Sequence, residues 1–338
     1  MNIGLNMPTH GLLYRQGRDI FIEKVVPEEL RLAQIAQRAE QLGYHSLWFP
    51  DHVLMPRMVA SAHTVNPESG KSAYGDQPNM FDAAVTMAAM ASCTTTIILA
   101  PSVLISPYRH PLSDARQFAS IDVLSGGRLL MAVGPGWCKE EFDALELPFA
   151  LRGAMTEECL QVYNLAWTQP WVSFSGRFYN FPDVSIDPKP AQRPRPRIVY
   201  GGVTAAGARR ALRHCDGFYP IVTAADAGRR QFTELRDLIR DEASAMGRDL
   251  ARFQMLTLVM CLLSRDGGAL GNTRPRLFMS GNAEKVAADL EILASLGYSH
   301  CTLHLDVRSR TITEFVDMME EFGELVLPLA GKFEASTL

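Results

Sequence analysis

Short, continuous apolar segments alternate along the chain with longer segments whose apolar residues recur every three or four positions. The first kind predicts buried strands and the second amphipathic helices. The predicted strands lie at residues 3–7, after Gly43, and at 95–104, 128–136, 197–202, 216–222, 253–263 and 298–307. The predicted helices lie at residues 27–42, 79–93, 110–125, 156–167, 204–215, 232–247, 282–297 and 312–327. The pattern is eight strands, each followed by a helix.

Eight such units with uninterrupted apolar strands favour an α/β fold, a (β/α)8 TIM barrel, since its parallel strands are buried on both sides. A doubly wound open sheet is the alternative. We expect one domain spanning residues 1–338, with insertions at about 55–78, 171–195 and 265–281. The second insertion alternates aromatic residues around Ser175 and Gly176, which predicts a β-hairpin. In a barrel, functional residues lie just after each strand.

The composition is that of an ordinary globular protein, with 47% hydrophobic and 21% charged residues and a formal net charge of −4. The acidic balance argues against a nucleic-acid partner and favours a small-molecule substrate. We find neither a signal-peptide pattern nor an apolar run long enough for a membrane span, and therefore expect a cytoplasmic protein. Six scattered cysteines without C-x-x-C spacing predict buried thiols, and no histidine pattern predicts a metal site.

Polar and aromatic residues follow the second and third predicted strands. Trp48 lies in the second apolar run, and Asp51 and His52 come directly after it. A histidine beside an acid at a strand end can act as a proton donor near neutral pH, although a capping aspartate and a packed histidine fit equally well. After the third strand, Ser102 interrupts the apolar run, and Arg109 could hold an anionic group or lie in solvent.

Glycines follow the fourth and fifth strands. Gly134 and Gly136 would allow a planar ligand to approach the backbone, and Trp137 could stack on it, but a tight turn beside a core tryptophan is an equal alternative. Gly201 and Gly202 end the fifth strand.

The helix after the fifth strand begins at Val203 and Thr204, where Thr204 can cap it. Free N–H groups at a helix start can bind phosphate, and an ordinary capped helix is the alternative.

Five segments occur in order along nearly the whole chain: LAQIAQRAEQLGYHSLWFPDHV, APSVLISPYRHP, ASIDVLSGGRLLMAVGPGW followed by EEF, FSGRFYNF, and YGGVTAAGARRALRHCDGF. Together they resemble the bacterial luciferase-like family of flavin and deazaflavin oxidoreductases. The resemblance implies a barrel that binds reduced FMN or coenzyme F420 at the C-terminal ends of its strands. It also implies a phosphate at Gly202, Val203 and Thr204, His52 near the reactive ring, and a non-prolyl cis peptide bond between Ser102 and Val103.

The resemblance implies an oxidoreductase, in the first place a monooxygenase that uses reduced FMN and O2 on a small organic substrate. His52 with Asp51 is then the candidate proton donor, and Trp48, Trp137 and the loop from Met55 to Pro78 would keep the pocket dry. F420-dependent hydride transfer is the alternative, favoured if Arg209, Arg210 and Arg213 form a basic groove.

The F420-dependent sugar dehydrogenases carry a glutamate where this chain has Trp137. A non-catalytic flavin-binding subunit is a further alternative. The family leads us to expect a homodimer and a separate flavin reductase as partner. Leu270 to Gly281 is a second segment expected to cover the pocket.

Overall fold

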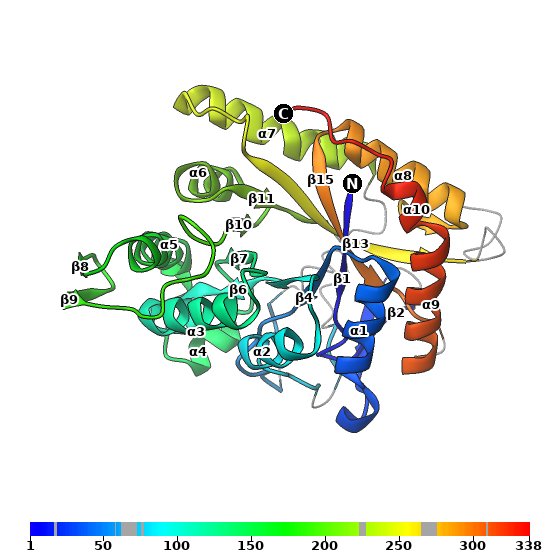
Figure 1. Ribbon diagram of the computed structural model, residues 1–338, viewed down its shortest axis with the longest axis horizontal. Helices are drawn as coiled ribbons and strands as arrows, with labels where there is room; N and C mark the ends of the chain where they lie inside the picture. The colour runs from blue at the N-terminus through cyan, green and yellow to red at the C-terminus, as the bar shows by residue number, and fades with distance from the viewer. Residues whose placement is uncertain are drawn as a thin grey trace.

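Eight parallel strands form a nearly closed barrel in the computed structural model, which describes residues 1–16, 19–57, 59–61, 73–75, 78–222, 228–264, 276–308 and 310–338 (Figure 1). The strands are β1 (Asn2–Asn6), β4 (Ser46–Phe49), β5 (Ile98–Pro101), β7 (Met131–Gly134), β10 (Ile198–Gly201), β11 (Gly217–Tyr219), β13 (Gln254–Leu263) and β15 (Tyr298–Leu305). Their order is β5-β4-β1-β15-β13-β11-β10-β7. Leu99 closes the circle because its backbone bonds to Arg128 and Leu130, just before β7.

Three two-residue strands extend the barrel strands at their C-terminal ends. β6 (Leu104–Ile105) pairs with β7, while β12 (Ile221–Val222) and β14 (Ser280–Gly281) pair with β13. All eight predicted strands are therefore present, and the predicted barrel is confirmed in preference to the open sheet.

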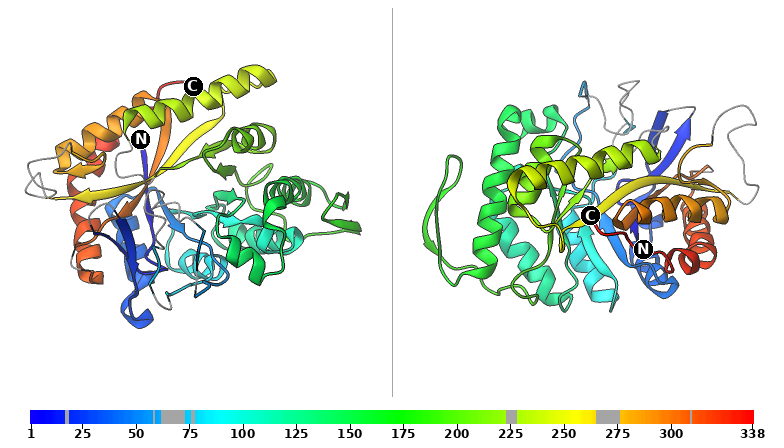
Figure 2. Two further views of the ribbon diagram at one scale, coloured as in Figure 1. Left: turned by 180° about the vertical axis from the view of Figure 1, so that it is seen from behind. Right: turned by 90° about the horizontal axis from the view of Figure 1, so that it is seen from above.

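Helices surround the barrel on its outside (Figures 1 and 2). They are α1 (Leu32–Leu42), α2 (Ala83–Cys93), α3 (Pro111–Leu124), α5 (Arg152–Thr168), α6 (Ala205–His214), α7 (Arg229–Met246), α8 (Ala283–Ser295), α9 (Ile312–Leu325) and α10 (Leu327–Ala330). The first begins five residues later than predicted, because Arg31 adopts the left-handed conformation and separates α1 from the short 3-10 helix η1 (Pro27–Glu29). Gly43, with φ of 90°, ends α1, as glycine commonly does at a helix C-terminus.

Two of the elements that the hydrophobic pattern did not predict lie near the C-terminal ends of the barrel strands or follow one of them. One is the hairpin of β2 (Leu12–Gln16) and β3 (Asp19–Glu23), and the other is the short helix α4 (Lys139–Ala144) after β7. The predicted hairpin in the second insertion is confirmed as β8 (Val172–Ser175) and β9 (Asn180–Val184), which stands away from the barrel (Figure 2). Much of the first insertion (55–78) and of the third (265–281) lies outside the described residues.

Side chains fill the interior of the barrel below its C-terminal end. Trp48 and Tyr219 are fully buried and stack with ring centroids 4.6 Å apart. The Trp48 indole N–H donates to Ser46, and the Ser46 hydroxyl contacts His300. The barrel interior is thus a packed core and not an open channel.

A buried carboxyl group, Asp114, lies outside the barrel between α3 and α5. The Tyr163 hydroxyl donates to Asp114 Oδ2 over 2.8 Å, whereas Asp114 Oδ1 has no hydrogen-bond partner. Burial raises the pKa of Asp114 to about 7. The native protein therefore retains a proton on Asp114 at pH values where the unfolded chain, with an aspartate pKa of about 3.9, has lost it.

We expect the free energy of unfolding of the wild type to fall as pH rises from about 4 to about 7, because folding then requires a proton that the unfolded chain lacks. Asp114→Asn removes this titration, so the variant should gain stability relative to wild type between pH 5.5 and 8. Urea unfolding at the two pH values measures the difference. Parallel pH profiles for the two proteins would contradict this explanation.

Candidate active site

A cavity of about 140 Å³ opens at the C-terminal ends of the barrel strands. Its lining residues come from β1, β4, β6, β12, β13 and β15 and from the segments after them: Asn6, Met7, His10, Gly11, Ile22, Pro50, Asp51, His52, Tyr74, Ser102, Val103, Ile105, Trp137, Ile221, Leu258, Met260 and His304. Five residues predicted from the sequence are among them: Asp51, His52, Ser102, Val103 and Trp137. We refer to this space as the mouth cavity.

His52 is held in place by a buried carboxylate. Its Nδ1 lies 2.8 Å from Glu141 Oε2, and the Tyr108 hydroxyl donates to the same oxygen over 2.7 Å. Because a carboxylate only accepts hydrogen bonds, Nδ1 carries a proton, and Nε2 is the ring nitrogen left for proton exchange. The Trp137 ring lies edge-on to His52, with centroids 6.0 Å apart.

Glu141 also fixes the backbone that follows β4. Its Oε1 accepts the N–H groups of Val53 and Leu54 at 2.7 and 3.3 Å, and its side chain has no exposed surface. Burial by itself would raise the pKa of Glu141, but hydrogen bonds and the charge of His52 outweigh it, so the pKa is lowered. Glu141 is therefore an ionised carboxylate with four donors around it.

Glu141 was not predicted as a site residue, although it lies in the EEF segment that contributed to the family resemblance. It lies on α4, 89 positions from His52, and α4 itself was not predicted. A glutamate in the first turn of a helix ordinarily indicates a favourable interaction with the helix dipole and nothing more. The contact with His52 forms because the segment after β4 and the segment after β7 lie next to each other in the folded protein.

Asp51 and Arg109 form an ion pair with each other. The two terminal guanidinium nitrogens donate to Asp51 Oδ1 and Oδ2 over 2.7 and 2.9 Å, and Asp51 also accepts the N–H of Ile105. Arg109 is thus paired within the protein, and its contact with an anionic part of a ligand stays a prediction. Asp51 anchors the segment after β5 through the Ile105 amide and Arg109.

A second histidine, His10, lies in the mouth cavity beside His52. Their ring centroids are 5.5 Å apart, and His10 Nδ1 is 3.1 Å from the Tyr74 hydroxyl. Burial raises the pKa of Tyr74, so the hydroxyl stays protonated and can donate to His10. No sequence pattern pointed to His10, because it follows β1 in a segment without a motif.

The peptide bond between Ser102 and Val103 is cis, as the family resemblance led us to expect. It separates β5 from β6 and places Val103 over the ends of two neighbouring strands. A Cβ atom on Gly134 or Gly201 would lie 2.6 or 2.8 Å from a Val103 methyl group. These glycines therefore leave room for Val103, and Val103 rather than their backbone faces the mouth cavity.

Two further predicted residues have packing roles. Gly136 has φ of 82°, and a Cβ atom there would lie 2.8 Å from Ile105 and 2.9 Å from Phe142. Trp48 was predicted to shape the pocket or contact the substrate, but it belongs to the buried layer below the mouth cavity and does not line it. That prediction is corrected, because an inward-facing residue in the middle of a barrel strand packs in the core.

The turn from Gly201 to Thr204 precedes α6 and lies outside the lining of the mouth cavity. Val203 is 49% exposed, and the Thr204 hydroxyl caps α6 by accepting the N–H of Gly207. The other amides of the first turn have no acceptor within the helix, which suits an anion. Both alternatives from the sequence, a capped helix and a phosphate site, fit this geometry.

The three arginines of α6 are paired with acidic residues. Arg209 lies 2.6 Å from Glu242, and Arg210 and Arg213 lie 3.4 and 3.5 Å from Glu157. Each of these arginines thus has an acidic neighbour, and Arg210 and Arg213 share one.

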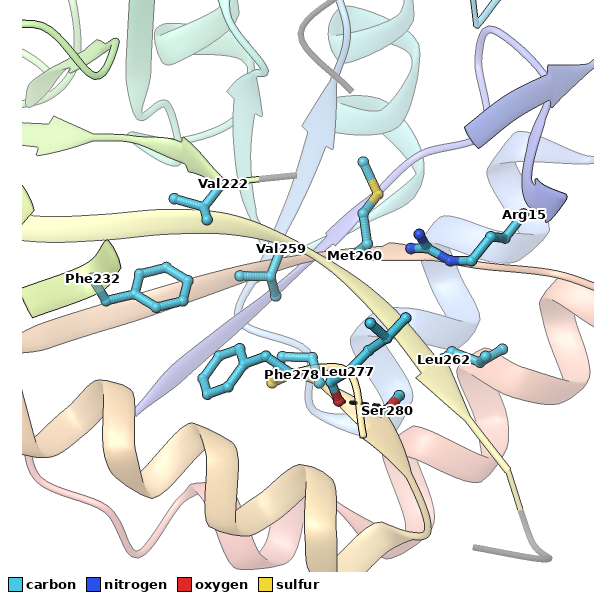
Figure 3. Close-up of a pocket in the computed structure, with 10 residues that line it drawn as sticks. Arg15, Val222, Phe232, Val259, Met260, Leu262, Leu277, Phe278 and Ser280 are labelled. Atoms are coloured by element: carbon cyan, nitrogen blue, oxygen red, sulfur yellow. Dashed lines mark hydrogen bonds between the residues drawn. The ribbon is translucent and has the colours of Figure 1, made fainter. Parts of the chain in front are cut away.

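A second space of only about 20 Å³ shares Met260 with the mouth cavity (Figure 3). Phe232 and Phe278 lie on one side, and the Arg15 guanidinium, paired with Asp306 at 2.9 Å, reaches in from the other. Its volume suits a single water molecule. The mouth cavity is therefore the better candidate for a substrate or cofactor.

Among the described residues, no cluster of three or more histidine, cysteine and acidic side chains could hold a metal ion. None of the helices in the described part of the chain is both long and apolar enough to span a membrane.

Comparison with protein families identifies one match: the model described as luciferase-like monooxygenase aligns with residues 12–290. An uncharacterised protein of Mycobacterium tuberculosis is 32% identical over 184 residues, which cover 54% of this chain and 62% of that protein. The FMNH2-dependent dimethylsulfone monooxygenase of Pseudomonas putida is 32% identical over 161 residues, which cover 47% of this chain and 44% of the enzyme. The aligned segments thus span about half to three fifths of these relatives.

A similar fold occurs in an F420-dependent secondary alcohol dehydrogenase whose structure contains an F420–acetone adduct. The two structures superimpose with a TM-score of 0.71 at 18% sequence identity, over 97% of this chain and 98% of the other. At this identity the likeness concerns the fold alone.

Gly201→Ala should lower the free energy of unfolding by about 1–3 kcal/mol, because the added methyl group overlaps Val103. Val103→Ala in the same chain should restore part of the loss, and chemical denaturation of both single variants and the double variant measures the coupling. Gly331→Ala is the control, since Gly331 has helical φ and its nearest neighbour would lie 3.5 Å away. Additive effects of the two substitutions would disprove the contact.

Glu141→Ala should destabilise the protein by about 2 kcal/mol or more, because it leaves buried donors without an acceptor. Hydrogen exchange should show lost protection at the amides of Val53 and Leu54, while Glu141→Gln, which retains an acceptor oxygen, should keep part of it. Glu140→Ala is a matched control, because Glu140 accepts from the amides of Ala60 and Ser61 instead. Unchanged exchange at Val53 and Leu54 in Glu141→Ala would show that the carboxylate does not hold this segment.

Proposed function

The chain belongs to the luciferase-like monooxygenase family, and on that premise we propose that it is a flavin-dependent monooxygenase with its active site in the mouth cavity. The observation that carries the proposal is the arrangement of His52 at the end of β4, with Nδ1 fixed by a buried carboxylate and its ring beside the cavity. The proposed substrate is a small organic molecule.

The residues of the mouth cavity fit a planar heterocyclic cofactor. Val103 and Ile105 offer an apolar surface on one side, Trp137 offers an aromatic ring, and Asn6 and His10 offer polar atoms. The turn Gly202–Thr204 at the start of α6 would hold a phosphate group. Reduced FMN, when bound, supplies the two electrons with which O2 places one oxygen atom on the substrate and releases the other as water.

The protein's own contribution would be positioning, proton transfer and exclusion of water. His52 Nε2 is the proposed site of proton exchange, since Nδ1 is engaged by Glu141. Glu141 and Tyr108 act through His52 and are positioning residues. Trp137, Met260 and Leu258 would limit the access of water, which favours oxygenation over the unproductive loss of reducing equivalents.

The ion pairs of α6 support FMN over F420. Coenzyme F420 carries additional negative charge on its tail, whereas Arg209, Arg210 and Arg213 already face Glu242 and Glu157. F420-dependent hydride transfer is the alternative function, supported by the shared fold of the F420-dependent dehydrogenase. The buried partner of His52 supports a catalytic role over that of a non-catalytic binding subunit.

We further propose that a separate flavin reductase supplies reduced FMN. The dimethylsulfone monooxygenase, a relative of this chain, is named for its dependence on FMNH2.

Anaerobic titration of the purified protein with FMNH2 and with reduced F420 tests the proposal. We expect FMNH2 to bind with micromolar or better affinity and F420 more weakly. Trp137→Ala should weaken FMNH2 binding about 10-fold through the lost aromatic contact, and Trp171→Ala, a 65% exposed residue at the outlying hairpin, should leave it unchanged. Tight binding of F420 alone would establish the alternative function, and binding of neither cofactor would refute both.

A further inference from the structure

Asn6 and His304 lie side by side at the mouth cavity, and the proposed function gives neither a role in the chemistry. β1 and β15 are parallel neighbours in which Leu5 pairs with Leu303, so the next residues of the two strands, Asn6 and His304, occupy adjacent positions. Both residues line the mouth cavity. They form one polar pair on the wall built by β1 and β15, whereas His52 follows β4.

Asn6 carries a buried acceptor without a hydrogen bond. The residue is only 2% exposed, and its side-chain oxygen Oδ1 has no partner in the structure. A buried polar atom without a partner costs about 1–3 kcal/mol, and nearly all such atoms in native proteins are satisfied. Because Asn6 lines the mouth cavity, a ligand with an N–H or O–H donor could satisfy this buried oxygen.

His304 adds a hydrogen-bonding group of complementary kind. Burial lowers the pKa of His304 to about 4, so its imidazole is neutral at neutral pH. A neutral imidazole has one N–H donor and one acceptor nitrogen. Next to the Asn6 oxygen, the wall therefore combines an acceptor for a ligand N–H with a donor for a ligand carbonyl.

We propose that Asn6 and His304 bind the –NH–CO– edge of the heterocyclic ring held in the mouth cavity, with Asn6 Oδ1 accepting from the ring N–H and His304 donating to the neighbouring carbonyl. The inference rests on the proposed function. Flavin and deazaflavin rings both carry this edge, so the inference holds for FMN and for F420. It assigns Asn6 and His304 to cofactor recognition and leaves proton exchange to His52.

The test compares FMN with its N3-methylated form, which has the same ring but no N–H donor on this edge. Asn6→Leu should weaken FMN binding about 10-fold, the effect of one hydrogen bond, and should leave the affinity for the methylated ring unchanged relative to wild type. The melting temperature of the ligand-free Asn6→Leu protein should equal or exceed that of wild type, because the substitution removes an unsatisfied acceptor. If the wild type binds F420 and not FMN, the same comparison is made with F420 and its methylated form.

His304 is tested with the same two ligands. His304→Leu should weaken binding of both rings, because the carbonyl is present in both, and His304→Gln, which keeps an N–H donor, should restore most of the affinity. Asn164→Leu is the control for loss of an asparagine. Asn164 is hydrogen-bonded to Leu160, His214 and Arg195 away from the cavity, so its substitution should lower the melting temperature without changing either affinity.

The inference is overturned if Asn6→Leu leaves the affinity for FMN unchanged. It is also overturned if the substitution lowers the affinities for FMN and for its methylated form equally and lowers the melting temperature, as loss of a purely structural residue would. Both results presuppose that the wild type binds the cofactor and leave the proposed function intact. A wild type that binds neither FMN nor F420 refutes the proposed function and this inference together.

Discussion

The mouth of the barrel depends on one buried carboxylate. Glu141 accepts hydrogen bonds from His52, Tyr108 and two backbone amides, and it has no contact with solvent. These donors belong to the segment after β4 and to the segment after β6, while Glu141 itself follows β7. An ionised carboxylate in this position is stable only with its donors in place, so three neighbouring loops are held in one arrangement. The orientation of His52 follows from that constraint.

Asp51, the residue directly before His52 in the chain, stabilises the same arrangement. It binds the Arg109 guanidinium through both oxygens and the Ile105 amide, and so joins the end of β4 to the segment that carries Ser102 and Val103. Beneath these contacts the barrel is filled by side chains such as Trp48 and Tyr219. The mouth cavity lies between this packed interior and the hydrogen-bonded segments above it.

The hydrophobic pattern predicts the barrel well, because burial on both faces of each strand is a local property of the sequence. It also places Asp51, His52 and Ser102 at strand ends, where they line the cavity. The hairpin β2–β3 was missed because each of its strands is only five residues long, which is too short for a clear repeat of polar and apolar residues. Glu141, His10, Asn6 and His304 were missed as site residues because their roles arise from contacts between strands far apart in sequence, which no spacing rule reports.

The sequence is also ambiguous where one residue type can serve either ligand binding or contacts within the protein. Gly134 and Gly201 suggested a backbone open to a ligand, but their missing side chains make room for Val103. Arg109 suggested an anion site or a solvent-exposed side chain, and the structure pairs its charge with Asp51. In each case the residue's surroundings are set by a neighbour in space that is distant in the sequence.

The proposed function requires a flavin-type ring to bind in the mouth cavity beside His52. A crystal structure of the protein grown with FMN is the most direct test. We expect electron density for the ring between Val103, Trp137 and Asn6, with His52 Nε2 facing it and the phosphate at the turn before α6. Density for FMN at any other place on the protein, with the mouth cavity filled by side chains or water, would refute this site.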